Sequence, residues 1–306
     1  MKLGFALPMA GAWATPENQV LVAQEAERAG YHSVWVFQRL FYALAPKNSY
    51  PPVPTPAWPK AFESVMDPVV TLAWVAGATR TIRLGTSVLV TAYYQPVMLA
   101  KMLATLDIVS GGRLDVGLGI GWSQDEYDIS GTPFSARGRR GDEFIRCLKA
   151  IWSEDVVEFG GEFYRVPRSR VEPKPVQKPH PPITVGGYGE AAVRRAVTLA
   201  DGFNGGNVPL AQVAPLVKQL RDGAAAAGRD PGRLHVVSRG TFVLHDRPQG
   251  PDRRPLWGTL DEIREDVERY AEAGLTELFL EGNFDPAGAS LDRAMTVLTA
   301  LAPGRR

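Results

Sequence analysis

The sequence of 306 residues has little of the chemistry that disulfide and metal sites require. It contains a single cysteine, which excludes an internal disulfide and any iron–sulfur or multi-cysteine metal site. Its four histidines are scattered and form no HxxxH or HxH pair, so no metal site is expected. Sparse cysteine is typical of proteins in a reducing compartment, and we expect a cytoplasmic location.

The sequence also has no excess of one charge and no long apolar run. Lysine and arginine number 34 against 33 acidic residues, a balance that argues against electrostatic binding of nucleic acid. No apolar run approaches the roughly 18–20 residues of a membrane helix, so a membrane is not an expected partner either. The opening MKLGFALPMAGAWAT resembles a signal peptide, but Pro8 interrupts its apolar run, and a buried strand at 2–7 is favoured.

What the sequence does contain is a repeated alternation of short β-branched runs and helical periodicity. Helix starts are marked by Thr15 before Pro16, by Asp67 before Pro68 and by a capping box from Thr259. Eight such units predict a single (β/α)8 TIM barrel over residues 1–306. A doubly wound open sheet is the alternative, but no glycine-rich turn follows the first strand. The expected strands lie at 2–7, 33–37, 82–89, 113–118, 183–185, 201–204, 235–244 and 275–280.

Two segments depart from this alternation. Residues 38–66 form a long excursion after the second strand, and its proline-rich part at 50–56 could be an SH3 ligand. Within a barrel loop, a semi-rigid lid is the better interpretation. Residues 153–182 form an insertion before the fifth strand, in which VVEFGGEFYRV at 156–166 predicts a hairpin turning at Gly160–Gly161.

Catalytic residues of such barrels follow the carboxyl ends of the strands, so these positions carry the candidate site. After the fourth strand, Gly119 and Gly121 would let a flat ring lie close to the backbone, with Trp122 and Asp125 at its edge. The run is not a G-x-G-x-x-G dinucleotide motif, because Trp122 occupies the sixth position. The alternative is that these glycines only relieve crowding at the rim of the barrel.

Two further strand ends supply candidates. After the fifth strand, Gly186, Gly187, Tyr188 and Gly189 open a helix, whose free N–H groups and positive dipole end suit a phosphate. An ordinary strand-to-helix turn would also explain them. After the second strand come Gln38 and Arg39, and Arg39 could equally be a solvated surface charge.

Taken together, these stretches resemble the luciferase-like monooxygenase superfamily, in particular its branch that uses the deazaflavin coenzyme F420. The resemblance covers nearly the whole chain. It rests on MKLGFALP, GYHSVWVF, TIRLGTSVLVTAYYQPVMLAKMLATLDIVSGGRLDVGLGIGW, DEYDISG, FGGEFYRV, PKPVQKPHPPITVGG and LADGF.

The resemblance implies a coenzyme F420 site, with FMN as the alternative cofactor, and a homodimer. It implies a non-prolyl cis peptide at Ser87–Val88, in a bulge of the third strand behind the ring. It further places the ring and side chain of the cofactor at Gly119 to Trp122 with Asp125, and its phosphate at Gly186 and Gly187.

One departure from the family bears on the reaction. Its F420-dependent sugar and alcohol dehydrogenases carry an Asp-His pair where this sequence has Gln38-Arg39, and arginine cannot exchange a proton near neutral pH. This favours reduction of a C=C or C=N bond in a small organic substrate over alcohol oxidation. Arg39 would anchor or polarise the substrate, Gln38 would hydrogen-bond the coenzyme, and Tyr94 or a water would donate the proton. The alternatives are an FMN-dependent two-component monooxygenase and a cofactor-binding protein without catalysis.

Overall fold

Within the described part of the chain, eight parallel strands close into a barrel, as the sequence predicts. The computed structural model describes residues 1–51 and 57–305. The sheet runs in the order β3-β2-β1-β13-β10-β9-β8-β5-β4, and pairing of β3 with β5 closes it. The barrel strands are β1 (Lys2–Ala6), β2 (Ser33–Val36), β3 (Arg83–Thr86), β5 (Leu114–Gly119), β8 (Ile183–Val185), β9 (Gly202–Gly206), β10 (His235–Thr241) and β13 (Glu277–Glu281), with β4 (Leu89–Val90) continuing the path of β3.

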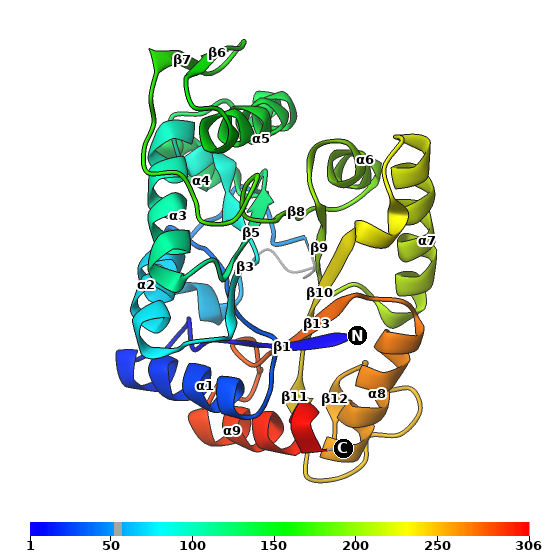
Figure 1. Ribbon diagram of the computed structural model, residues 1–306. Coiled ribbons are helices and arrows are strands. Elements are labelled where there is room, and N and C mark those ends of the chain that lie inside the picture. The colour runs from blue at the N-terminus through cyan, green and yellow to red at the C-terminus, as the bar shows by residue number, and fades with distance from the viewer. Residues whose placement is uncertain (52–56, 306) are drawn as a thin grey trace.

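Helices surround the strands on all sides (Figure 1). Several begin where the capping residues predict: the Thr15 side chain accepts from the Asn18 N–H, and that of Asp67 accepts from two N–H groups of its helix. Thr259 and Glu262 form the expected capping box. The helices are α1 (Pro16–Arg28), α2 (Pro68–Ala78), α3 (Pro96–Ser110), α4 (Gln124–Ser130), α5 (Arg137–Ser153), α6 (Glu190–Leu199), α7 (Leu210–Ala226), α8 (Leu260–Glu272) and α9 (Leu291–Ala300), with 3-10 turns η1 (Lys60–Phe62), η2 (Thr91–Tyr93), η3 (Phe134–Ala136), η4 (Pro231–Arg233) and η5 (Pro303–Arg305).

The predicted insertion contains the expected hairpin, formed by antiparallel β6 (Val157–Gly160) and β7 (Arg165–Ser169). It projects from the barrel beyond α5 (Figure 1). The excursion after β2 runs over the mouth of the barrel, where Tyr50, Trp58 and Phe62 are buried. The predicted proline-rich lid falls partly on residues 52–56, which lie outside the described residues.

Two expected strands are shorter than predicted. The run at 82–89 is interrupted after Thr86 by the Ser87–Val88 peptide, which is cis as the family resemblance implies. The run at 235–244 leaves the barrel at Thr241, because β11 (Val243–Leu244) pairs instead with β12 (Trp257–Gly258). Both breaks depend on pairing with other strands, so local sequence preference alone could not place either one.

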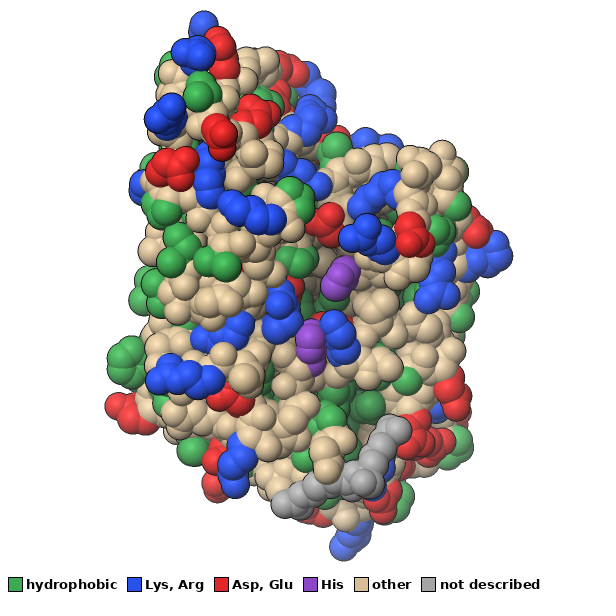
Figure 2. Space-filling view, viewed as in Figure 1, with side chains coloured by type: hydrophobic (Ala, Val, Ile, Leu, Met, Phe, Trp, Pro, Cys, Tyr) green, Lys and Arg blue, Asp and Glu red, His purple; other side chains and the backbone are tan. Residues whose placement is uncertain are grey.

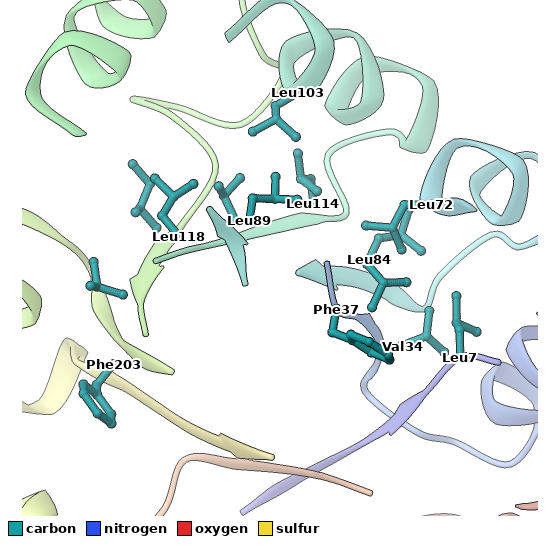
Figure 3. Close-up of a cluster of buried hydrophobic side chains, with 14 of the residues drawn as sticks. Leu7, Val34, Phe37, Leu72, Leu84, Leu89, Leu103, Leu114, Leu118 and Phe203 are labelled. Atoms are coloured by element: carbon teal, nitrogen blue, oxygen red, sulfur yellow. The ribbon is translucent and has the colours of Figure 1, made fainter. Parts of the chain in front are cut away.

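Buried side chains form two layers. Leucines and valines on the outward faces of the strands pack against the helices, as Leu114 does beside Leu103 of α3 (Figure 3). A separate cluster inside the barrel consists of Ala6, Trp35, Val237 and Phe279. Trp35 stacks on Phe279 with ring centroids 4.9 Å apart. Its ring also packs against Gly85, where any side chain would collide with it. The barrel is therefore solid below its mouth, and any ligand must bind above this layer.

Surface charge is mixed. On the face shown in Figure 2, acidic and basic side chains alternate without a field of one sign. In the described residues, no helix is both long and apolar enough to cross a membrane.

Candidate active site

A cavity of about 410 Å³ opens at the carboxyl ends of the barrel strands. TIM-barrel enzymes carry their active sites at this end, and the volume suits a cofactor-sized molecule. Among the described residues, Tyr94, Asp125 and Gly189 of the predicted set lie outside its lining. The predicted residues that line it are Gln38, Arg39, Ser87, Val88, Gly119, Gly121, Trp122, Gly186, Gly187 and Tyr188.

Val88 forms the centre of the cavity floor. A side-chain carbon built on Gly119 would lie 2.5 Å from Val88 Cγ2, and one on Gly186 would lie 2.9 Å from Val88 Cγ1. These two glycines therefore make room for Val88. The result is an apolar seat flanked by bare backbone on both sides, a surface on which a flat ring can rest.

The bulge that carries Val88 is held by Asn204 at the end of β9. Ser87 Oγ donates to Asn204 Oδ1 at 2.9 Å, and Asn204 Nδ2 donates to Thr86 O at 3.3 Å. The glycines that follow Asn204 suggest a ligand-binding turn in the sequence, but nothing there marks the Asn204 side chain itself. Its role depends on contacts with a strand far away in sequence, which no local pattern reveals.

Gln38 is fixed from two sides. Its Nε2 donates to the Tyr94 hydroxyl at 2.5 Å, and its Oε1 accepts from the Val90 N–H at 2.8 Å. Burial raises the pKa of Tyr94 to about 12, although the hydrogen bond from Gln38 opposes this. Tyr94 therefore lies behind Gln38 rather than on the cavity wall, and it can act on a ligand only through Gln38.

Arg39 lies in the wall, but its charge is balanced. Its Nη1 is 2.8 Å from Glu126 Oε2, and the two side chains are 6% and 0% exposed. Glu126 also accepts from the Leu40 N–H and the Tyr93 hydroxyl. The guanidinium lies against two aromatic rings, 4.9 Å from the Trp122 centroid and 5.3 Å from that of Phe62.

Two predicted residues point elsewhere. The carboxylate of Asp125 accepts from the Lys47 N–H at 3.0 Å and so anchors the excursion. Its neighbour Glu126 is the acid that reaches the wall, one position along the first turn of α4. Gly189, with φ of +78°, precedes the first residue of α6 and lies outside this cavity.

The N-terminus of α6 forms the polar end of the cavity. Gly187 has φ of +151°, and the lining here includes Arg137 and Arg195. Arg195 is buried and pairs with Asp142, while Arg137 donates to Phe134 O at 3.0 Å and faces no carboxylate in the described residues. Backbone N–H groups, a helix dipole and an unmatched cation together suit a phosphate or carboxylate.

Near Tyr188, Arg239 of β10 and Tyr50 of the excursion form a polar pair that the sequence interpretation missed. Arg239 Nη2 donates to the Tyr50 hydroxyl at 2.8 Å, and the guanidinium lies 5.0 Å from the Phe284 ring centroid. Arg239 is 7% exposed. An arginine inside the expected strand at 235–244 is the available signal, since a charge in a buried strand is costly unless it is paired. No group of three or more His, Cys, Asp or Glu in the described residues could hold a metal ion.

A closed (β/α)8 barrel with a cofactor-sized cavity at its carboxyl end defines the class of the protein. The chain belongs to the luciferase-like monooxygenase family, whose sequence model matches residues 1–253. It is 32% identical over 228 residues to an uncharacterized protein of Mycobacterium tuberculosis, covering 73% of this chain and 77% of that protein. It is also 39% identical over 158 residues to an FMNH(2)-dependent dimethylsulfone monooxygenase of Pseudomonas putida, covering 49% of this chain and 41% of the relative.

Solved structures share the fold over the whole chain. The monooxygenase RslO1 from Streptomyces bottropensis has a TM-score of 0.79 at 23% identity, covering 99% of this chain and 98% of its own. An F420-dependent secondary alcohol dehydrogenase, solved with an F420-acetone adduct, has a TM-score of 0.79 at 16% identity, covering 100% of this chain and 99% of its own.

Proposed function

We propose that the protein is an oxidoreductase that uses coenzyme F420 to reduce a C=C or C=N bond in a small organic substrate. The observation that carries this proposal is the apolar seat at Val88, bordered by Gly119 and Gly186, next to the cationic N-terminus of α6. In this proposal a tricyclic ring lies on the seat, and an anionic chain leading from it extends toward Arg137.

The polar end favours F420 over FMN. Both cofactors carry a phosphate, but F420 continues into a tail of several carboxylates. Arg137 faces no carboxylate in the part of the chain that the structure describes, so it can receive such a group. An F420-dependent alcohol dehydrogenase of the same fold has been solved with an F420-acetone adduct, which supports F420 as a ligand for a barrel of this kind.

The residues at the ring end favour reduction over alcohol oxidation. When bound, the reduced deazaflavin supplies the hydride. Arg39 is held by Glu126 and cannot accept a proton near neutral pH, and no histidine of the described residues lines the cavity. The described lining residues include no histidine or carboxylate that could take a proton from a substrate hydroxyl near neutral pH. In this proposal Gln38, fixed by Tyr94 and Val90, presents its amide to the cofactor.

The proton that completes a reduction requires a donor on the wall, and we assign this role to Tyr50. Its oxygen accepts from Arg239, which leaves its own O–H hydrogen free to point toward a ligand. Tyr94 lies behind Gln38 and is a positioning residue in this scheme.

An FMN-dependent monooxygenase is the second candidate. It is favoured by the identity to the P. putida FMNH(2)-dependent enzyme over 158 residues. Binding titrations of F420 and FMN, followed by tryptophan fluorescence, test the choice, because Trp122 lies in the cavity wall. We expect F420 to bind more tightly, and a Trp122→Phe variant to lose most of the quenching. Tighter binding of FMN would reverse the assignment, and binding without turnover of any acceptor would leave a non-catalytic binding protein.

We also propose a homodimer formed through α2 and α3, which lie side by side on the barrel surface (Figure 1). Their outer faces expose Val70, Trp74, Met98 and Val109 by 55–68%. Contiguous large apolar side chains on a surface are typical of protein interfaces.

A further inference from the structure

A second cavity, of about 680 Å³, lies beside the first at the mouth of the barrel. Tyr50 and Arg239 line both cavities and so form part of their common wall. The second cavity extends between the loops that follow β1 and β13 and the segment around β12. Most of its lining is apolar, with Trp13, Trp257 and Phe284 providing the large surfaces.

The walls of this second cavity contain hydrogen-bond donors that have no acceptor. The indole Nε1 atoms of Trp13 and Trp257 and the Nε atom of Arg239 are buried and lack a partner. Trp13 and Arg239 are 6% and 7% exposed. A buried N–H without an acceptor costs about 1–3 kcal/mol, so three such donors on residues that line one cavity favour a ligand that brings acceptor atoms. Indole and guanidinium groups can only donate, so these acceptors must be oxygens or similar atoms.

The charges around this cavity are predominantly positive. Its rim carries Lys60 and Arg254, for which the described residues provide no carboxylate partner. Asp285, the one acid in the described lining, pairs with Arg293 at 3.0 Å, and the charge of Arg239 is met by Glu281. Desolvation raises the pKa of the buried Glu281 carboxyl, although Arg239 opposes this. The unmatched charges that remain are cations.

We infer that this second cavity is the substrate chamber and that it binds an organic anion, in which a carboxylate or sulfonate is joined to a flat apolar body. The anionic group meets Arg254 and the indole donors, while the body lies against Trp13 and Phe284. The shared wall at Tyr50 and Arg239 then directs the other end of the molecule toward the seat at Val88. This inference deepens the proposed oxidoreductase function. That the bound anion is the substrate rests on the proposed function, but the binding of an organic anion in this cavity does not.

The test uses the full chain without cofactor and a fixed pair of probes, 2-naphthoate and its neutral analogue 2-naphthamide. Isothermal titration calorimetry at low salt measures both dissociation constants. We expect naphthoate to bind about tenfold or more tightly than naphthamide, the scale of one charge-assisted hydrogen bond. Arg254→Met should abolish this preference, and Trp257→Phe should weaken both probes because each offers an oxygen to the indole N–H. Arg221→Met, which removes an exposed arginine of α7, is the matched control and should change nothing.

Equal binding of the two probes, no binding of naphthoate, or unchanged affinities in both variants would each overturn the inference. Thermal melting curves confirm that the variants are folded. A competition titration separates this inference from the proposed function. If FMN or F420 displaces naphthoate, the probe occupies the first cavity and the second chamber is wrongly assigned, whichever cofactor the enzyme uses. Naphthoate binding that is lost in Arg254→Met supports the chamber even if neither cofactor binds.

Discussion

The guanidinium of Arg39 and the carboxylate of Glu126 form a buried ion pair, with Nη1 2.8 Å from Oε2. The pair joins the start of the excursion to α4, and it holds Arg39 against Trp122 and Phe62. The cation that the sequence places over the barrel mouth is thus already partnered. Its geometry is suited to holding the aromatic wall in place.

Replacing Arg39 tests whether the residue does more than this. Arg39→Ala leaves the Glu126 charge buried without a partner, so we expect a loss of about 3–5 kcal/mol in the free energy of unfolding. The double variant Arg39→Ala, Glu126→Gln should recover most of that stability, as measured by urea denaturation. If turnover returns with stability, Arg39 acts by positioning the wall. A double variant that regains stability but not turnover would indicate that Arg39 contacts the substrate directly. In that case we expect the loss of kcat/KM to correspond to about 2–4 kcal/mol of transition-state free energy, with cofactor affinity unchanged.

The phosphate subsite at the N-terminus of α6 can be tested at Gly187. Gly187→Asp should weaken binding of the cofactor by roughly tenfold or more, because a carboxylate there repels a phosphate. Gly187→Ala is the necessary control, since φ is +151° and a Cβ would lie 2.9 Å from that of Ala192. Arg137→Met should also weaken binding without any change in the backbone. Equal cofactor affinity in Gly187→Asp, Gly187→Ala and the wild type would show that the phosphate does not bind at this site.

Whether a feature of the fold or the site can be predicted from the sequence depends on how far apart in the chain its interacting residues lie. Helix starts such as Thr15 and Asp67 were predicted because a cap bonds to an N–H only two or three positions away. The pairing of Arg239 with Tyr50 joins residues 189 positions apart, so neither could be recognised as a partner. The break after Thr86 is indicated by the family resemblance alone, because it depends on the pairing of Leu89 and Val90 with β5.

A different limit applies to Asp125. Two adjacent acids follow the fourth strand, and the sequence does not say which one faces inward. In the structure, the Ser123 cap sets the first turn of α4 so that Glu126 is buried and Asp125 faces the excursion. Helix phase, which is set by the cap, decides between the two.

Glu277 at the base of the barrel should make stability depend on pH. Its Oε1 accepts from the Ser33 hydroxyl and, at 2.9 Å, from Trp35 Nε1. Burial raises its pKa from 4.5 to about 7, with a further rise from Asp115, while the bonds from Ser33 and Trp35 and the charge of Lys2 oppose this. The folded state therefore keeps a proton that the unfolded state has released. The resulting stabilisation is complete below about pH 4.5 and is lost as the pH rises through 7.

Glu277→Gln isolates this effect. The variant should gain up to about 3 kcal/mol relative to the wild type between pH 5 and pH 8, measured by urea denaturation at each pH. The comparison is needed because His32 acts in the opposite direction: burial lowers its pKa to about 4, so its contribution to stability grows between pH 4 and 6.5. Glu268→Gln on the exposed side of α8 is the control. A constant difference between Glu277→Gln and wild type across the pH range would contradict the assignment.

The proposed dimer predicts that a charge on the α2–α3 face produces monomers. Met98 is 63% exposed, and burial of this face in an interface of ordinary size would cover about 800 Å² per subunit. Met98→Glu should shift the sedimentation coefficient to that of a monomer without lowering the melting temperature of the subunit. Ile129→Glu on α4, equally apolar and 68% exposed, should leave the oligomeric state unchanged. Sedimentation of the wild-type protein as a monomer at micromolar concentration would contradict the proposed dimer.

Tyr50 provides the test of the proposed chemistry. In Tyr50→Phe the ring keeps its place against Phe62 and Trp122, with centroids 5.2 Å away in each case, but the hydroxyl that accepts from Arg239 is gone. If Tyr50 delivers the proton, we expect turnover of any accepted substrate to fall about 10²-fold or more, the usual scale for losing a general acid. Cofactor affinity should stay the same, and the solvent deuterium isotope effect on kcat should change.

Tyr42→Phe is the matched control, because Tyr42 lies in the same excursion and its hydroxyl bonds to Trp58 O at 3.2 Å, outside both cavities. It should retain full turnover. A purely structural role for Tyr50 would lower the melting temperature and raise KM while leaving the isotope effect on kcat as in the wild type. Proton delivery by Tyr50 predicts a changed isotope effect together with an unchanged melting temperature, because in Tyr50→Phe the proton must come from water or another group.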